Sequence, residues 1–128
     1  NYSVATGGYD NNSIGTYSAI LGGVEGESEG DASTIAGGYL NKARGLRSSV
    51  LSGYSNTVDT SAGYASIQGG YLNYVSGSVA TISGGSNNEA TGDYSHVSGG
   101  YNNSASGEYS AVLGGQSQLE TTQYGTTP

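Results

Sequence analysis

Tyrosine is the residue whose spacing most suggests contact with another molecule. The chain has twelve tyrosines and no phenylalanine or tryptophan. Eleven of them fall into two series with a spacing of about fifteen residues or its multiples, and Tyr74 belongs to neither. The first series is Tyr2, Tyr17, Tyr64, Tyr94, Tyr109 and Tyr124, and the second is Tyr9, Tyr39, Tyr54, Tyr71 and Tyr101. Repeated aromatic rings can bind sugars or a flat protein surface. They can equally stack on one another or fill a groove between subunits, which we favour.

Residues suited to catalysis or metal binding are few. His96 is the one histidine and cysteine is absent, so no catalytic triad and no thiolate site can be assembled. The acidic stretch at residues 25–31 could gather carboxylates around a hard cation such as calcium. Basic residues follow one repeat later, which favours a solvated, neutralised surface instead. The sequence therefore predicts a non-enzymatic protein with no cofactor and no metal.

Composition and charge restrict the class of partner. The net charge is -7, and the three basic residues, Lys42, Arg44 and Arg47, lie close together in the sequence. This balance disfavours nucleic acid and anionic membranes as partners. No apolar run approaches the length of a membrane span, so we expect no membrane insertion by this segment. Large apolar residues are too rare for an ordinary globular core, whereas a strict repeat favours order over disorder.

The elements that must position the tyrosines follow from this repeat. Numbering each unit from the small residue four places before a glycine pair, we obtain eight coils that start at residues 3, 18, 33, 48, 65, 80, 95 and 110. All are fifteen residues long except the fourth, which has seventeen, with the two extra residues near Ser61 and Ala62. The predicted domain spans residues 1–124, and residues 125–128 are a tail or the continuation of a longer chain.

Each coil is expected to contain two short strands. Position 3 is nearly always β-branched, and alternation around it is typical of a half-buried strand. The predicted core is Ile20, Ile35, Val50, Ile67, Ile82, Val97 and Val112. Position 11 supplies a second inward column of small residues, and turns are expected at the glycine pair and at position 13. The predicted fold is therefore all-β, a parallel β-solenoid or β-roll of eight coils with about 15 residues per coil.

Asparagine recurs at position 9 of six coils. The series is Asn11, Asn41, Asn56, Asn73, Asn88 and Asn103. Stacked amides can hydrogen-bond from coil to coil and to turn carbonyls, which would form an asparagine ladder. Asparagine also tolerates the left-handed turn conformation, so a simple turn role is the alternative. The sequence leaves both interpretations open.

The repeat resembles the head repeats of trimeric autotransporter adhesins, the YadA-like heads. The resemblance rests on the phrase at residues 110–114 and on turns such as Ala105-Ser106-Gly107, repeated along essentially the whole chain. Similar repeats occur in phage tail fibres. The chain departs from the family in having fifteen rather than fourteen residues per coil, in its doubled glycine and in lacking a recognisable neck, stalk or anchor. The resemblance implies a left-handed β-roll, a homotrimer and adhesion at a bacterial surface.

A thin core and apolar residues at outward positions 2 and 4 predict self-association. We expect an extracellular or cell-surface structural and adhesive fibre module that binds a surface, matrix protein or glycan. The alternatives are an extracellular filament subunit that stacks head to tail, coil upon coil, and a segment of a virion fibre.

Overall fold

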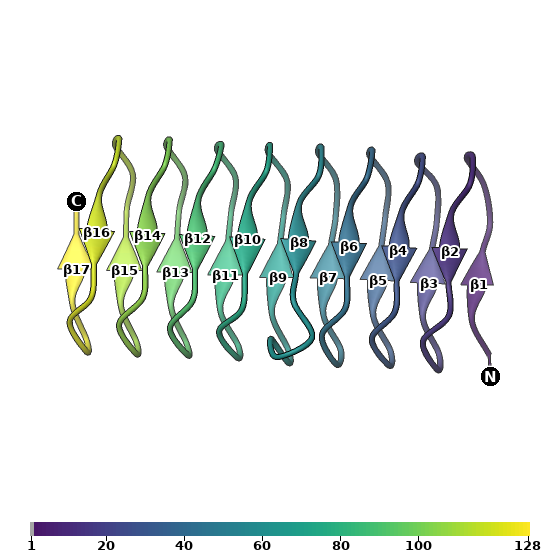
Figure 1. Cartoon of the computed structure of the whole chain (residues 1–128), viewed down its shortest axis with the longest axis horizontal. Coiled ribbons are helices and arrows are strands. Elements are labelled where there is room, and N and C mark those ends of the chain that lie inside the picture. The colour runs from purple at the N-terminus through teal and green to yellow at the C-terminus, as the bar shows by residue number, and fades with distance from the viewer. Residues whose placement is uncertain (1) are drawn as a thin grey trace.

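The computed structural model describes residues 2–128 as a solenoid built entirely from short strands (Figure 1). Every strand has two residues, because glycines and turns interrupt the chain at fixed points in each coil. The odd-numbered strands are β1 Val4–Ala5, β3 Ala19–Ile20, β5 Thr34–Ile35, β7 Ser49–Val50, β9 Ser66–Ile67, β11 Thr81–Ile82, β13 His96–Val97, β15 Ala111–Val112 and β17 Thr126–Thr127. The even-numbered strands are β2 Asn12–Ser13, β4 Glu27–Ser28, β6 Lys42–Ala43, β8 Thr57–Val58, β10 Tyr74–Val75, β12 Glu89–Ala90, β14 Ser104–Ala105 and β16 Leu119–Glu120.

The strands form two parallel sheets that share one register. The odd-numbered strands make a nine-stranded sheet and the even-numbered strands an eight-stranded sheet, each in sequence order. Equivalent positions pair from coil to coil, as Ile20 does with Ile35 and Ser28 with Ala43. Position 7 adds a third column of isolated parallel bridges, which runs from Tyr9 to Gln116. The predicted parallel β-solenoid is confirmed, with about eight turns of roughly fifteen residues. The left-handed winding implied by the resemblance stays a prediction.

Two corners per coil depend on residues in the left-handed conformation. The residues at positions 8 and 15 have φ between 53° and 60°, as in Leu72 and Val79. Most backbone N–H groups donate to the following coil, but these two donate to the preceding one. Thr34 donates to Ser48 O, for example, whereas Leu72 donates to Tyr54 O at 3.0 Å and Val79 to Gly63 O at 2.8 Å. The left-handed residue thus reverses one amide at each corner, and the chain turns there without losing a hydrogen bond.

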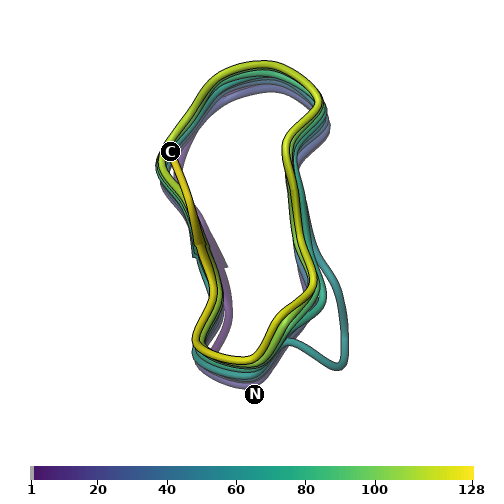
Figure 2. The same cartoon turned by 90° about the vertical axis from the view of Figure 1, so that its left-hand side faces the viewer.

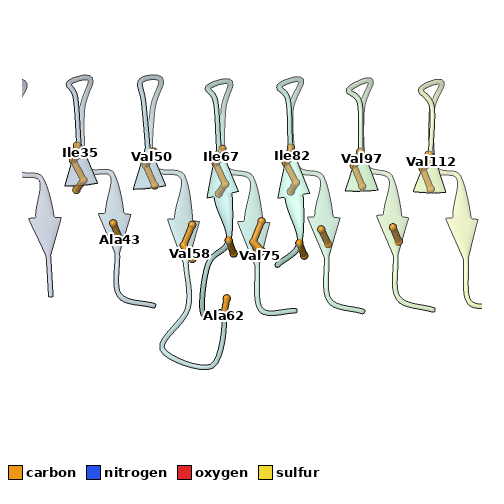
Figure 3. Close-up of a cluster of buried hydrophobic side chains, with 14 of the residues drawn as sticks. Ile35, Ala43, Val50, Val58, Ala62, Ile67, Val75, Ile82, Val97 and Val112 are labelled. Carbon is orange, nitrogen blue, oxygen red and sulfur yellow. The ribbon is translucent and has the colours of Figure 1, made fainter. Parts of the chain in front are cut away.

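The core is a narrow double row of side chains between the two sheets (Figure 3). The predicted core residues at position 3 of coils 2 to 8 are at most 1% exposed, and Val58, Val75 and three alanines face them from position 11. Ala5, at position 3 of the first coil, is exposed. Where position 11 is valine, position 1 of the next coil is alanine, as in Val58 and Ala65. Where position 11 is serine, position 1 is a serine that it hydrogen-bonds, as in Ser28 and Ser33 at 2.7 Å.

The long fourth coil departs from the repeat in one place, a loop that projects from the outline of the solenoid (Figure 2). The extra residues are Thr60 and Ser61, both exposed. Ala62 belongs to the interior instead, since it is fully buried and its carbonyl lies over Gly45, at position 13 of the preceding coil. The sequence placed the two extra residues near Ser61 and Ala62, which is one residue too late. The reason is that Ala62 occupies position 13, where most coils have glycine.

The predicted domain limits can be compared with the structure except at Asn1, which lies outside the described residues. The segment at residues 125–128 is paired rather than loose. Thr126 and Thr127 align with Ala111 and Val112, so the same register carries on into a ninth coil.

Candidate functional site

The position-15 tyrosines form a column along one corner of the solenoid. Tyr94 and Tyr109 stack with ring centroids 4.8 Å apart and Tyr109 and Tyr124 at 5.0 Å, with interplanar angles below 10°. Tyr2 and Tyr17 stack at 5.3 Å. The spacing between coils sets these distances, because parallel strands repeat at about 4.8 Å.

One arginine takes a place in this column. Arg47 occupies position 15 of coil 3, and its guanidinium carbon lies 5.4 Å from the ring centroid of Tyr64 in coil 4. Its Nη1 also donates a hydrogen bond to the Tyr64 hydroxyl at 2.9 Å. A guanidinium therefore occupies one rung of an otherwise aromatic column, in a combined cation–π and hydrogen-bonding contact.

The position-7 tyrosines form a second column near the glycine-pair corner. Tyr39, Tyr54 and Tyr71 stack continuously, with both neighbouring centroid distances at 5.2 Å. Val24 and Ser86 interrupt the column and separate this trio from Tyr9 and Tyr101.

Both columns remain accessible although their rings cover one another. All eleven tyrosines are between 37% and 74% exposed. Within a continuous stack the ring faces lie against neighbouring rings, so edges and hydroxyl groups face the solvent. A flat ligand can reach a ring face only where the stack is interrupted. Stacking along the columns was the interpretation that we favoured from the sequence.

The asparagines at position 9 form a ladder beneath the glycine pairs, which is buried except at Asn11. Asn88 is typical: its Nδ2 donates to Gly84 O at 3.0 Å and to Gly100 O at 3.1 Å, and its Oδ1 accepts from Asn103 N at 2.9 Å. The set Asn11, Asn41, Asn56, Asn73, Asn88 and Asn103 repeats the Nδ2 pattern. None of the six has a positive φ, so the alternative turn role is wrong. The amides mainly bridge backbone groups, and Asn56 Nδ2 to Asn41 Oδ1 is the amide–amide bond recorded within residues 2–128.

Two of the three basic residues, Lys42 and Arg44, pair with glutamates of the acidic stretch on the outer face of the eight-stranded sheet. Lys42 Nζ lies 3.2 Å and Arg44 Nη2 2.8 Å from Glu27 Oε2, and Arg44 Nε lies 3.4 Å from Glu29. Burial raises the pKa of Glu27, but the hydrogen bonds and positive charges of Arg44 and Lys42 together outweigh it and leave that pKa below its ordinary value. The Tyr74 hydroxyl donates to Asp59 at 2.7 Å and lowers the pKa of that carboxyl.

The remaining candidates stand apart from the columns. His96 lies on the outer face of the nine-stranded sheet, where its Nδ1 is 2.6 Å from Thr81 Oγ1 and its Nε2 2.9 Å from Ser98 Oγ. Over residues 2–128, no three metal-ligating side chains gather at a common point. The same part of the chain contains no helix able to cross a membrane.

No family model matches the chain, and no curated protein matches it.

Proposed function

We propose that the chain is a non-enzymatic extracellular fibre module, similar to a YadA-like head, that acts through its outer surface. The observation that carries this proposal is the alignment of exposed tyrosines in two columns along a rod. Such columns offer many weak, equivalent contacts to a matrix protein, a glycan or a cell surface, and their contributions combine when several rungs engage.

The outer face of the nine-stranded sheet supports self-association into a homotrimer. In residues 2–128 its outward positions, 2 and 4, carry no aspartate, glutamate, lysine or arginine. Leu21, Leu51 and Leu113 are each about half exposed on this face. A flat, uncharged sheet face with scattered leucines has little to repel a second copy and some apolar area to bury.

Assembly and adhesion can be tested on the purified chain. Light scattering coupled to size exclusion should give a discrete trimer, and Leu51→Glu should shift it to smaller species. Immobilised matrix proteins and glycans should capture the trimer, and substituting Tyr39, Tyr54 and Tyr71 together with serine should reduce capture. A monomer that no surface captures would refute the proposal.

A filament subunit is the second candidate, favoured by one observation. β17 pairs with β15 in the same register that all the other neighbouring coils share. A terminal coil of another chain could pair with a sheet edge in the same way and continue the rod. Electron microscopy of the chain would then show long fibres of uniform width in place of discrete particles.

A further inference from the structure

The position-15 column is interrupted at Val79, where no planar side chain stands between two tyrosines. We call this gap between the two rings the vacant rung. Tyr64 and Tyr94 stand one coil to either side, and Val79 between them is too short to continue the stack. One face of Tyr64 lies against Arg47 and one face of Tyr94 against Tyr109, so each ring has its other face toward Val79. Tyr64 and Tyr94 are 53% and 50% exposed, against 42% for Tyr109, which has a ring on both sides.

The size of this gap matches a planar group. Two coil steps separate Tyr64 from Tyr94, which corresponds to about 10 Å. The occupied rungs show what such a step accepts: a phenol ring between Tyr94 and Tyr124, with centroid distances of 4.8 and 5.0 Å, and the Arg47 guanidinium at 5.4 Å from Tyr64.

The negative charge around the gap favours a guanidinium over a neutral phenol ring. Asp93 lies next to Tyr94 in the sequence, and its Oδ1 accepts a hydrogen bond from Ser78 N at 2.9 Å, which fixes a carboxylate beside the gap. The pKa of Tyr109 is raised, first by desolvation and then by the negative charge of Glu108, with Asp93 also contributing. The net charge of -7 further favours a cation. The gap therefore suits a flat cation better than a neutral ring.

The two-residue insertion lies in the fourth coil, which also carries Tyr64, one wall of the gap. Ser61 Oγ donates to Ser76 O at 3.1 Å, and Ser78 Oγ donates to Ser61 O at 3.4 Å. These two bonds fasten the loop, which is the one that projects in Figure 2, to the residues between β10 and Val79.

We propose that the vacant rung between Tyr64 and Tyr94 binds the guanidinium of an arginine presented by a partner protein. The guanidinium lies between the two ring faces, above Val79, and pairs with Asp93. This inference rests on the proposed function as a surface-binding rod and names the chemistry of one contact.

The probe is N-acetyl-arginine amide, titrated into the chain while the ring signals of the tyrosines are followed by NMR. We expect saturable shifts at Tyr64 and Tyr94, smaller ones at Tyr109, and a midpoint in the millimolar range for a single side chain. N-acetyl-lysine amide should bind several-fold more weakly, because an ammonium cannot stack as a plane.

Substitutions then assign the effect to the rung. Val79→Tyr should weaken binding at least tenfold, and its backbone is acceptable because Tyr94, Tyr109 and Tyr124 have φ between 58° and 60° at the same position. Tyr94→Leu removes one wall and should have a similar effect. Ala32→Tyr is the matched control: it fills the gap between Tyr17 and Arg47, away from the proposed site, and should leave the shifts at Tyr64 and Tyr94 unchanged.

Three results would overturn the inference: equal midpoints in the original chain and Val79→Tyr, shifts spread evenly over all tyrosines, or equal binding of the lysine probe. None of these would affect the proposed function, which fails on assembly and surface capture instead.

Discussion

The chain turns at two corners in each coil, and different side chains fill the two turns. At the glycine-pair corner, positions 5 to 9, a buried asparagine amide fills the inside of the turn, as Asn88 does. At the tyrosine corner, positions 13 to 15, a glycine lies directly against the next coil and an outward side chain follows it. Both corners contain a left-handed residue, at position 8 and at position 15, whose amide donates to the preceding coil. This backbone device is shared, but the filling differs, and the glycine-pair corner has a second positive φ at its position-6 glycine.

The comparison separates two reasons for glycine, conformation and space, and one position at which neither holds. At position 6, Gly85 has φ +84°, and an added Cβ would overlap Gly100 O. At position 13, Gly92 has no positive φ, but a Cβ would overlap Gly107 O, so space alone requires glycine. At position 5, Gly84 has no atom within 4 Å of an added Cβ, so neither reason applies.

The largest expected effect comes from the second glycine of a pair. Gly85→Ala forces a left-handed alanine against a backbone carbonyl and should lower the free energy of unfolding by about 3–5 kcal/mol. Chemical denaturation followed by circular dichroism measures this. The neighbouring Gly84→Ala should change stability by less than about 1 kcal/mol. Equal losses in the two variants would show that the pair acts as one turn unit, contrary to the geometry.

The next largest effect tests the filling of the glycine-pair corner. Asn88→Ala leaves Gly84 O and Asn103 N without their partners and should cost about 2–4 kcal/mol. The control is Asn87→Gly, which keeps a left-handed residue and removes only a 3.1 Å bond to Ser86 Oγ. It should cost less than about 1 kcal/mol. Hydrogen exchange should also show faster exchange at the Asn103 amide in Asn88→Ala, and protection of that amide would contradict the ladder.

The sequence predicted the coil but not the reasons for its corners. Because the period is strict, register, strand positions and the inward columns follow from the spacing of residues such as Ile82 and Val97. The left-handed residues could not be predicted, because tyrosine, leucine and valine at positions 8 and 15 are poor candidates for positive φ. The interleaving of Arg47 with Tyr64 was also missed, although both are at position 15. A search of that column for planar groups rather than aromatic residues would have found it.

The ladder has one gap that a substitution can close. Coil 2 carries Gly26 at position 9, so Asn41 N has no side-chain oxygen beneath it, unlike Asn56 N, which donates to Asn41 Oδ1 at 3.0 Å. Gly26→Asn should therefore raise the free energy of unfolding by about 1 kcal/mol. An added Cβ would lie 3.1 Å from Asn11 Oδ1, so that amide must shift slightly. Gly26→Ala provides the control, since it adds the Cβ without the amide, and it should not stabilise the chain.

The smallest expected effect compares the left-handed residues of the two corners. Val79 and Leu72 have φ of 60° and 54° and are 40% and 41% exposed. A β-branched residue is the more strained in this conformation, whereas asparagine tolerates it. Val79→Asn should therefore stabilise the chain by about 1 kcal/mol and Leu72→Asn by roughly half of that. Both changes remove similar exposed apolar surface, so the difference in their denaturation midpoints reports backbone strain. If Leu72→Asn stabilises as much as Val79→Asn, branching at Cβ does not determine the cost of turning this corner.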